Sequence, residues 1–206
     1  IFIEKSTFEN NTGTYEGGAI HLDIKVSTIT DCSFINNLCY TTSESAESKG
    51  GAIFIRSKSD YEQTIKSCEF TKNLAKTAGG SIFIDFSTYS YKSSLILTCF
   101  FSESSSGQKG GGICLQYQNS INGISGETII EGSVFISCLS DIGGCLYLSD
   151  LSNTKSDEKT INNCTFSKSN STSHGSAIYS ETNYINISNS SFLSCLAVGE
   201  GTFYIY

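Results

Sequence analysis

Apolar and polar residues alternate along this chain in short runs that recur about every thirty residues. Each run is three to six residues long and is bounded by Gly, Asn or Ser. Alternation with a period of two indicates β-strands, and no window keeps helical spacing over three turns. The pattern therefore predicts an all-β chain whose unit is two or three short strands joined by bends.

The repeated unit reads I-x-x-C-x-F-x-x-N, then a short spacer, then G-G-A-I-x-I, and it occurs seven times. A repeat of this length indicates a stacked architecture. The seven Phe positions are Phe8, Phe34, Phe70, Phe101, Phe135, Phe166 and Phe192. The aliphatic position after the glycines is held by Ile20, Ile53, Ile82, Ile113, Leu146, Ile178 and, less typically, Phe203.

One unit cannot bury its own apolar face, so the units must stack on one another. Like sequence stacked on like sequence gives parallel ladders about 4.8 Å apart. We therefore predict a right-handed, single-stranded parallel β-helix of about seven coils over residues 1–206, the hand following the crossover preference of parallel strands. A strand pattern opens at Ile1 and closes at Ile205 without a polar capping coil, so we expect this single domain to be one stretch of a longer solenoid.

The same motif carries a family resemblance. Cys32, Phe34 and Asn37 followed by residues 50–53 (G-G-A-I), and the equivalent residues 68–82, resemble the repeat of the polymorphic outer membrane proteins of chlamydiae, known by F-x-x-N and G-G-A-[ILV]. Related repeats occur in large surface proteins of some protists. The resemblance spans the chain, and it implies a right-handed, surface-exposed, adhesin-like β-helix.

Charge narrows the range of partners. The net charge is −7, the isoelectric point is about 4.8, and the 13 basic residues are scattered. Phosphate recognition needs clustered Lys and Arg, so nucleic acid and anionic membranes are disfavoured. No apolar run approaches the length of a membrane span, so we expect no direct membrane insertion by this segment. A protein, a glycan or another subunit of an extracellular assembly remains as the partner.

Nine cysteines are many for a cytosolic domain. Four occupy the motif column: Cys32, Cys68, Cys99 and Cys164. They are either a stack of buried thiols or disulfides between coils, because stacked Cα atoms fall within disulfide range. The chain has no C-x₂-C pair, so we predict no metal site and no cofactor.

Five N-x-[ST] sequons make candidate N-glycosylation sites at Asn10, Asn163, Asn170, Asn186 and Asn189. Asn163 and Asn189 precede inward positions, so both should face solvent. Sequons together with cysteines favour a secreted or cell-surface glycoprotein.

An aromatic column lies between the two inward aliphatics of the G-G-A-I-x-I half, and alternation predicts that it points outward. Its members are Phe54, Phe83, Tyr147, Tyr179 and Tyr204, with His21 and Cys114 in the remaining coils. We call the five aromatic residues the aromatic stripe. It is either a self-stabilising ladder partly covered by loops or an exposed stripe that contacts a protein or sugar partner.

Insertions follow the G-G-A-I-x-I half, and the longest runs from Gln116 to Thr128. The spacer of coil two, after Asn37, is also expanded. Long connections should gather along one edge of the rod, where repeat proteins often bind; they are otherwise tolerated insertions.

Catalytic residues are not evident. The alternative function is a polysaccharide-active, pectate-lyase-like β-helix enzyme, which needs clustered acidic and basic groups on one face. His21 and His174 lie five coils apart, and Asp23, Arg56 and Asp85 fit a surface charge ladder. We therefore predict a non-catalytic adhesin or structural scaffold at the cell surface or outside the cell, with no catalytic residue.

Overall fold

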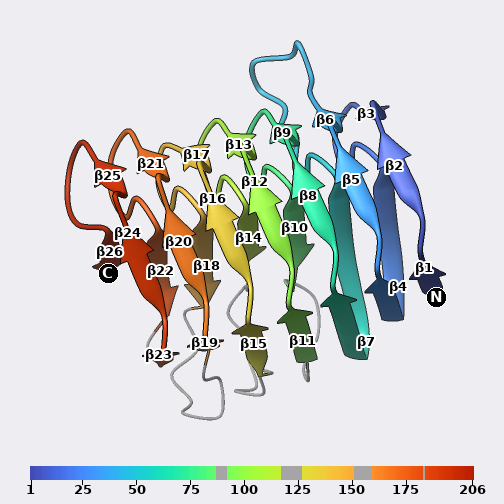
Figure 1. Ribbon diagram of the computed structural model, residues 1–206. Coiled ribbons are helices and arrows are strands. Elements are labelled where there is room, and N and C mark those ends of the chain that lie inside the picture. Colours follow the sequence, from blue (N-terminus) through green and yellow to red (C-terminus); the bar gives the residue numbers. More distant parts are fainter. Residues whose placement is uncertain (87–91, 117–126, 151–158, 183) are drawn as a thin grey trace.

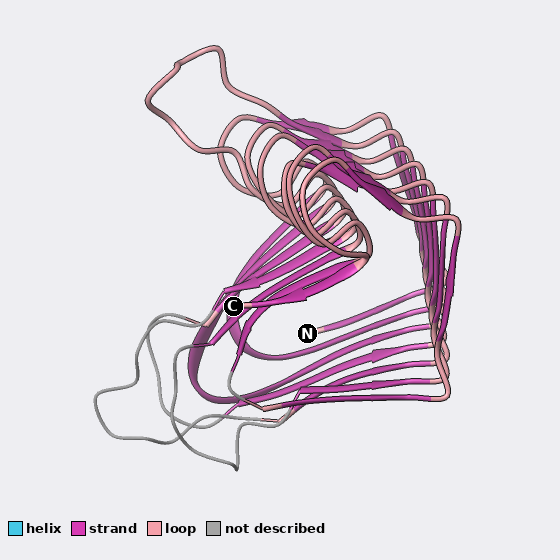
Figure 2. Ribbon diagram, turned by 90° about the vertical axis from the view of Figure 1, so that its left-hand side faces the viewer, coloured by secondary structure: helices cyan, strands magenta, loops and turns pink. Residues whose placement is uncertain are grey.

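The computed structural model describes residues 1–86, 92–116, 127–150, 159–182 and 184–206. Within these ranges every regular element is a β-strand, and the strands pair in parallel to form three sheets that run along a rod (Figure 1). Consecutive turns of the chain lie on one another when the rod is viewed along its length (Figure 2). The predicted parallel β-helix is confirmed.

The largest sheet has twelve strands. It contains the Ile that stands five residues before each motif Phe, which we call the Ile column, and the G-G-A-I-x-I half of each coil. Along this sheet lie β1 (Phe2–Glu4), β4 (Ile20–Thr30), β7 (Ile53–Lys66), β10 (Ile82–Asp85), β11 (Lys92–Leu97), β14 (Ile113–Gln116), β15 (Thr128–Glu131), β18 (Leu146–Asp150), β19 (Lys159–Asn162), β22 (Ile178–Thr182), β23 (Ile185–Ser188) and β26 (Phe203–Ile205).

Two sheets of seven strands complete each coil. The Phe sheet contains β2 (Thr7–Glu9), β5 (Ser33–Ile35), β8 (Glu69–Thr71), β12 (Phe100–Ser102), β16 (Val134–Ile136), β20 (Thr165–Ser167) and β24 (Ser191–Leu193). The third sheet contains β3 (Thr12–Gly13), β6 (Leu38–Cys39), β9 (Leu74–Ala75), β13 (Ser105–Ser106), β17 (Leu139–Ser140), β21 (Asn170–Ser171) and β25 (Leu196–Ala197).

The repeat sets the register of every ladder. Phe70 pairs with Phe34 on one side and Phe101 on the other, and Ile82 pairs with Ile53 and Ile113. Equivalent motif residues therefore form continuous columns, as the sequence predicted. The register is strongly specified because a one-residue slip would turn the apolar face outward.

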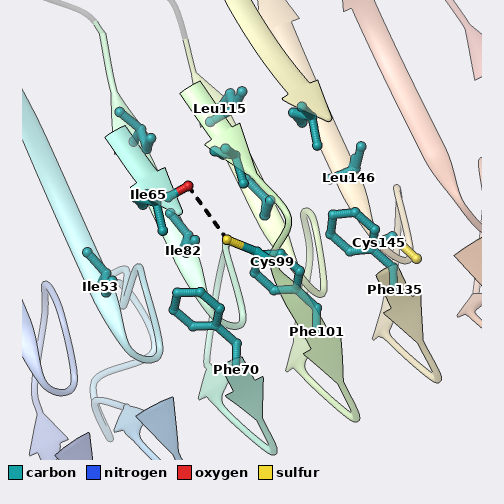
Figure 3. Close-up of a cluster of buried hydrophobic side chains, with 14 of the residues drawn as sticks. Ile53, Ile65, Phe70, Ile82, Cys99, Phe101, Leu115, Phe135, Cys145 and Leu146 are labelled. Carbon is teal, nitrogen blue, oxygen red and sulfur yellow. Dashed lines mark hydrogen bonds between the residues drawn. The ribbon is translucent and has the colours of Figure 1, made fainter. Parts of the chain in front are cut away.

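The core is built on the stacked Phe column. Phe34, Phe70, Phe101, Phe135 and Phe166 are fully buried, and neighbouring ring centres are 4.6–5.0 Å apart. Figure 3 shows Phe70, Phe101 and Phe135 beside the aliphatic residues of the large sheet. Burial of each ring contributes roughly 2–3 kcal/mol in transfer terms. The inward Phe column is confirmed.

Bends on both sides of the Phe strand use left-handed residues. Around β8 these are Ser67 (φ 51°) and Lys72 (φ 56°), and most other coils repeat the pair with non-glycine residues. The two glycines of each pair are required for different reasons, the first for its backbone conformation and the second for lack of space. Gly79 has φ 64°, which glycine adopts without steric cost, and a Cβ on Gly80 would lie 2.1 Å from the Gly111 carbonyl oxygen of the next coil.

A short asparagine ladder runs through the first three coils. The Asn73 Oδ1 accepts from the Asn37 backbone N–H at 2.9 Å and from its Nδ2 at 3.0 Å. The Asn37 Oδ1 accepts from Asn11 in the same way. From coil four the position is held by Ser or Cys, so the ladder ends there, as expected.

The strands that flank the connections between coils end along one edge of the large sheet. In coil two, β7 runs unbroken through this edge, and it pairs with β10 by its first half and with β11 by its second half. In later coils the two halves are separate strands, and their ends stack: Asp85 pairs with Gln116, and Ser94 with Thr128. Residues 87–91, 117–126 and 151–158 of these connections lie outside the described residues, so the gathering of long loops along this edge stays a prediction. That residues 1–206 are one stretch of a longer solenoid stays a prediction.

Candidate functional site

The aromatic stripe lies on the outer side of the large sheet, yet it is not exposed. Phe54, Phe83 and Tyr147 are each 1% exposed and Tyr179 is 8% exposed, whereas Tyr204 in the last coil is half-buried. The rings stack: Phe54 and Phe83 have centres 5.5 Å apart, and Tyr147 and Tyr179 likewise 5.5 Å. The stripe is thus part of a second apolar cluster outside the main core.

The cover is the residue that precedes each glycine pair. These residues form a ladder of single parallel bridges that joins Glu16, Lys49, Ala78, Lys109 and Ile142. We call this ladder the roof column. Ala78 and Ile142 belong to the apolar cluster of the stripe, so the spacer of each coil folds back over the outer face of the sheet. Figure 2 shows these loops curling close to the strands of the large sheet.

Cationic members of the roof column lie over the rings. The Lys49 Nζ is 5.0 Å from the centre of the Phe83 ring, and the Lys109 Nζ is 4.6 Å from that of Tyr147. Cations over aromatic faces are attracted by the ring quadrupole. The aliphatic stems of the two lysines also cover apolar surface.

Of the two interpretations of the stripe, the exposed contact surface is therefore wrong for Phe54, Phe83, Tyr147 and Tyr179, and the covered ladder describes these four rings. Alternation within one strand was interpreted correctly, because these rings do point away from the main core. The error arose because a residue some five positions earlier in each unit returns over them. The sequence contains no signal for this cover, because the residue before the glycine pair varies from Glu16 and Lys49 to Ala78 and Ile142, and the spacer has no periodic pattern that would place it.

A charged cluster lies at the N-terminal end of this outer face. The Arg56 guanidinium forms an ion pair with Glu16 and lies 3.7 Å from the Asp85 carboxylate, and the His21 Nδ1 is 3.5 Å from Glu16. Asp23 and Asp85 flank Arg56 in register, as the charge-ladder interpretation expected. Glu16 was not anticipated, because it comes from the spacer. The carboxylates of Glu16 and Asp85 are engaged with a cation, which is an arrangement for structural pairing.

The motif cysteines are buried free thiols in this structure. The Cys99 Sγ donates to the Ile65 carbonyl oxygen of the preceding coil at 3.6 Å (Figure 3), and Cys68 makes the same contact to Ile29 at 3.6 Å. Each thiol also contacts a carbonyl two residues earlier, at 3.2 Å for Cys68. The thiol-stack interpretation therefore describes the column, and the disulfides between coils are not formed.

All five sequon asparagines are exposed: Asn10, Asn163, Asn170, Asn186 and Asn189. Asn163 (φ 53°) and Asn189 (φ 50°) lie at the same left-handed bend of successive coils, where the side chain points to solvent as expected. Whether any of the five carries a glycan stays a prediction.

The expanded spacer of coil two projects beyond the neighbouring coils as a loop above β6 in Figure 1. We call residues 40–47 the coil-two loop. Tyr40 is 48% exposed, and residues 42–45 and 47 are exposed as well. Lys76 holds the base of the loop: its Nζ donates to the Ser43 carbonyl oxygen and lies 5.8 Å from the centre of the Tyr40 ring.

In the described part of the chain, no group of three or more His, Cys, Asp or Glu residues is placed to hold a metal ion. Across the same residues no helix has the length and apolar character to cross a membrane.

Comparison with known proteins identified the repeat. Residues 5–23 and 31–56 match the model of the Chlamydia polymorphic membrane protein (Chlamydia_PMP) repeat. Neither the curated proteins nor the solved structures included a match to the chain. The two matched segments contain the Phe8 and Phe34 strands and the glycine pairs that follow them. The first two coils therefore match the Chlamydia polymorphic membrane protein repeat, as the F-x-x-N and G-G-A-I motifs predicted.

Proposed function

We propose that this chain is the β-helical part of a secreted or cell-surface protein, which acts without catalysis as an adhesin or structural scaffold. The observation that carries the proposal is the match of the first two coils to a repeat of chlamydial membrane proteins. In-register Phe and Ile columns continue the same unit through all seven coils. A rod of this kind is suited to displaying loops along its sides.

The exposed sequons support a location outside the cell. Four of them lie in the last two coils with exposed side chains: Asn163, Asn170, Asn186 and Asn189. Bulky glycans there would meet neither the core nor the roof column. Expression in a eukaryotic secretory host should give a mass excess that an N-glycosidase removes, and its absence at all five asparagines would remove this support.

Contact with a partner is assigned to the coil-two loop in place of the buried aromatic stripe. This loop is largely exposed, projects from the rod (Figure 1) and carries two carboxylates, Glu44 and Glu47, of which Glu47 forms an ion pair with Lys49. Its acidic character favours a partner surface with basic groups or hydroxyl-rich sugars. The stacked coils below the loop hold its two ends in place. This reduces the conformational entropy that the loop loses on binding.

The test uses a loop deletion matched to coil three. Coil two has twelve residues between Asn37 and Gly50, and coil three has five between Asn73 and Gly79. Leu38 and Cys39 pair with Leu74 and Ala75, and Lys49 bridges to Ala78. Deletion of residues 41–47 leaves five residues in coil two, so the shortened coil should still stack.

We expect the intact chain to bind members of a glycan array or of a panel of immobilised extracellular matrix proteins. The deletion should abolish this binding while the urea midpoint changes little. Undiminished binding by the deletion variant would remove the loop from the contact surface. Cleavage of pectate or another acidic polysaccharide in parallel assays, with no binding to either panel, would replace the proposal with the enzyme alternative.

A further inference from the structure

Coil five carries cysteine at two positions that lie on either side of the third-sheet strand β17 and the turn that follows it. The first position lies three residues after the Phe, and the second directly follows the glycine pair. In coil three these positions are Asn73 and Ser81, and the Asn73 Nδ2 is 3.5 Å from the Ser81 Oγ. In coil five they are Cys138 and Cys145.

Both cysteines are buried and both contact the same side chain, that of Ser169. Cys138 is 1% exposed and Cys145 is fully buried. The Ser169 Oγ of the next coil accepts from the Cys145 thiol at 2.9 Å and from the Cys138 backbone N–H at 3.3 Å. Burial raises the pKa of the Cys145 thiol, and its hydrogen-bonding contact with the Cys138 thiol raises it further.

Other cysteine pairs fit a disulfide less well. Thiol contacts also join Cys68 to Cys32 and to Cys99. These three residues stack in register, however, and side chains of a parallel ladder keep the strand separation of about 4.8 Å, whereas a disulfide needs Cβ atoms about 3.5–4.5 Å apart. Cys195 lies two coils from Cys138, hence roughly 9.6 Å away, beyond the Cα range of about 4.4–6.8 Å. The thiol contact between Cys138 and Cys145 lies instead within one coil.

We propose that Cys138 and Cys145 form a disulfide within coil five when the chain folds in the presence of a small-molecule disulfide such as oxidised glutathione. One cysteine thiolate attacks the glutathione disulfide and releases one glutathione thiolate. The second cysteine thiolate then attacks the protein sulfur of the mixed disulfide and releases the other glutathione. The protein gives up two protons and two electrons, and the oxidised glutathione becomes two molecules of reduced glutathione. This proposal does not depend on the proposed function.

Such a bond would close a small ring around the turn of coil five. The ring includes Ile142 of the roof column and Gly143, which has φ 64°. The disulfide would therefore fix the roof directly beside Tyr147. The gain in loop-closure entropy is smaller for a short ring than for a long one, so the effect should be local.

The experiment is refolding of the full chain with a mixture of reduced and oxidised glutathione, followed by alkylation in denaturant without reductant. We expect Cys138 and Cys145 to stay unlabelled, and Cys32, Cys68, Cys99 and Cys164 to be labelled. The tryptic peptide of residues 110–155 contains both cysteines and should lack two hydrogen atoms until it is reduced. Fragmentation of this peptide separates the proposed pair from any bond to Cys114.

The control variants use residues that other coils carry at the same positions. Cys145→Ala copies Ala52 and Ala177, and Cys138→Ser copies Ser104 and Ser169, so both variants should fold. Each should leave the other cysteine of the pair fully labelled. The oxidised parent should have a higher urea midpoint than the reduced parent, and the double variant should show no difference. Complete labelling of both cysteines in the oxidised parent, or pairing of either with a different cysteine, would overturn the proposal.

Discussion

The Lys109 ammonium lies 4.6 Å from the centre of the Tyr147 ring, and its Nζ donates to the Tyr147 hydroxyl oxygen at 3.0 Å. That hydroxyl in turn donates to the Glu181 carboxylate at 2.7 Å. Burial, and then the contact with Glu181, raise the pKa of Tyr147, which keeps the hydroxyl protonated as a donor. One residue of the roof column, one of the aromatic stripe and one carboxylate thus form a polar chain over an apolar ladder.

Tyr147→Phe tests this chain. The ring and its stacking on Tyr179 are retained, but Lys109 and Glu181 lose the hydroxyl that links them. We expect a loss of about 1–2 kcal/mol in the free energy of unfolding, the usual cost of removing one partner of a partly buried hydrogen bond. Urea melts of the variant and the parent measure it. Tyr184→Phe, at a 37% exposed tyrosine, is the control and should cost almost nothing. Equal losses in the two variants would show that the Tyr147 hydroxyl has no special role.

Phe83→Ser tests whether the aromatic stripe is a packing ladder. Phe83 is buried between Phe54 and Cys114, under Lys49. We expect a loss of about 3–5 kcal/mol, as for truncation of other buried aromatic residues. Phe100→Ser, at a ring 37% exposed on β12, should cost much less. A stable Phe83→Ser protein that still folds like the parent would show that the roof column does not cover this ring.

Phe70→Ala tests the main core. Phe70 stacks between Phe34 and Phe101 at centre distances of 4.9 and 4.8 Å, so the deletion leaves a cavity in the middle of the column. We expect a loss of about 3–5 kcal/mol. Glu69→Ala, at the exposed neighbour on β8, is the matched control and should be close to neutral. A loss below about 1 kcal/mol for Phe70→Ala would contradict an interior Phe column.

Asn73→Ala tests the asparagine ladder. The substitution removes the acceptor of the Asn37 backbone N–H and of its side-chain amide, and both groups are buried. Each buried donor left without a partner costs about 1–3 kcal/mol. Asn73→Ser should be milder, because Ser104 holds the equivalent position in coil four. If both substitutions cost the same small amount, the amide ladder would not contribute to stability.

Alkaline pH should weaken the fold through the buried thiols. Burial raises the pKa of Cys39 and of Cys164 from the model-compound value of 9.0 to about 11. Below pH 9 both states hold these protons, so the stability is present in full; above it the unfolded state releases them first. The free energy of unfolding should therefore fall as the pH rises from 9 towards 11.

The matched variant is Cys39→Ala with Cys164→Ser. Ala75 pairs with Cys39 in register, and Ser133 holds the equivalent of Cys164 in coil five. Urea melts at pH 8 and pH 10.5 should show a smaller alkaline loss for this variant than for the parent, with the remaining thiols accounting for the rest. An identical loss in parent and variant would assign the alkaline weakening to other groups.

Much of the fold follows from the sequence because its information is local and repeated. Period two in the F-x-x-N and G-G-A-I halves identifies strands, and the recurrence of the unit aligns Phe70 with Phe34 and Phe101 in the ladders. The inward direction of Phe70, Ile82 and Cys68 also follows, because alternation assigns faces along one strand. The exposed position of Asn163 is determined by the same rule.

What covered the outer face of the large sheet was decided only by the tertiary structure. Alternation states that Phe83 and Tyr147 point away from the core, but it carries no information about the path of the spacer that brings Lys49 and Lys109 over them. The same applies to the contact between Cys138 and Cys145, which depends on how the turn of one coil closes. Spacers lack periodicity, and their course is set by backbone contacts to the next coil, such as the bridge between Lys109 and Ile142. Whether a surface is covered by another segment depends on the path of the whole coil, so it cannot be predicted from the residue pattern of one strand.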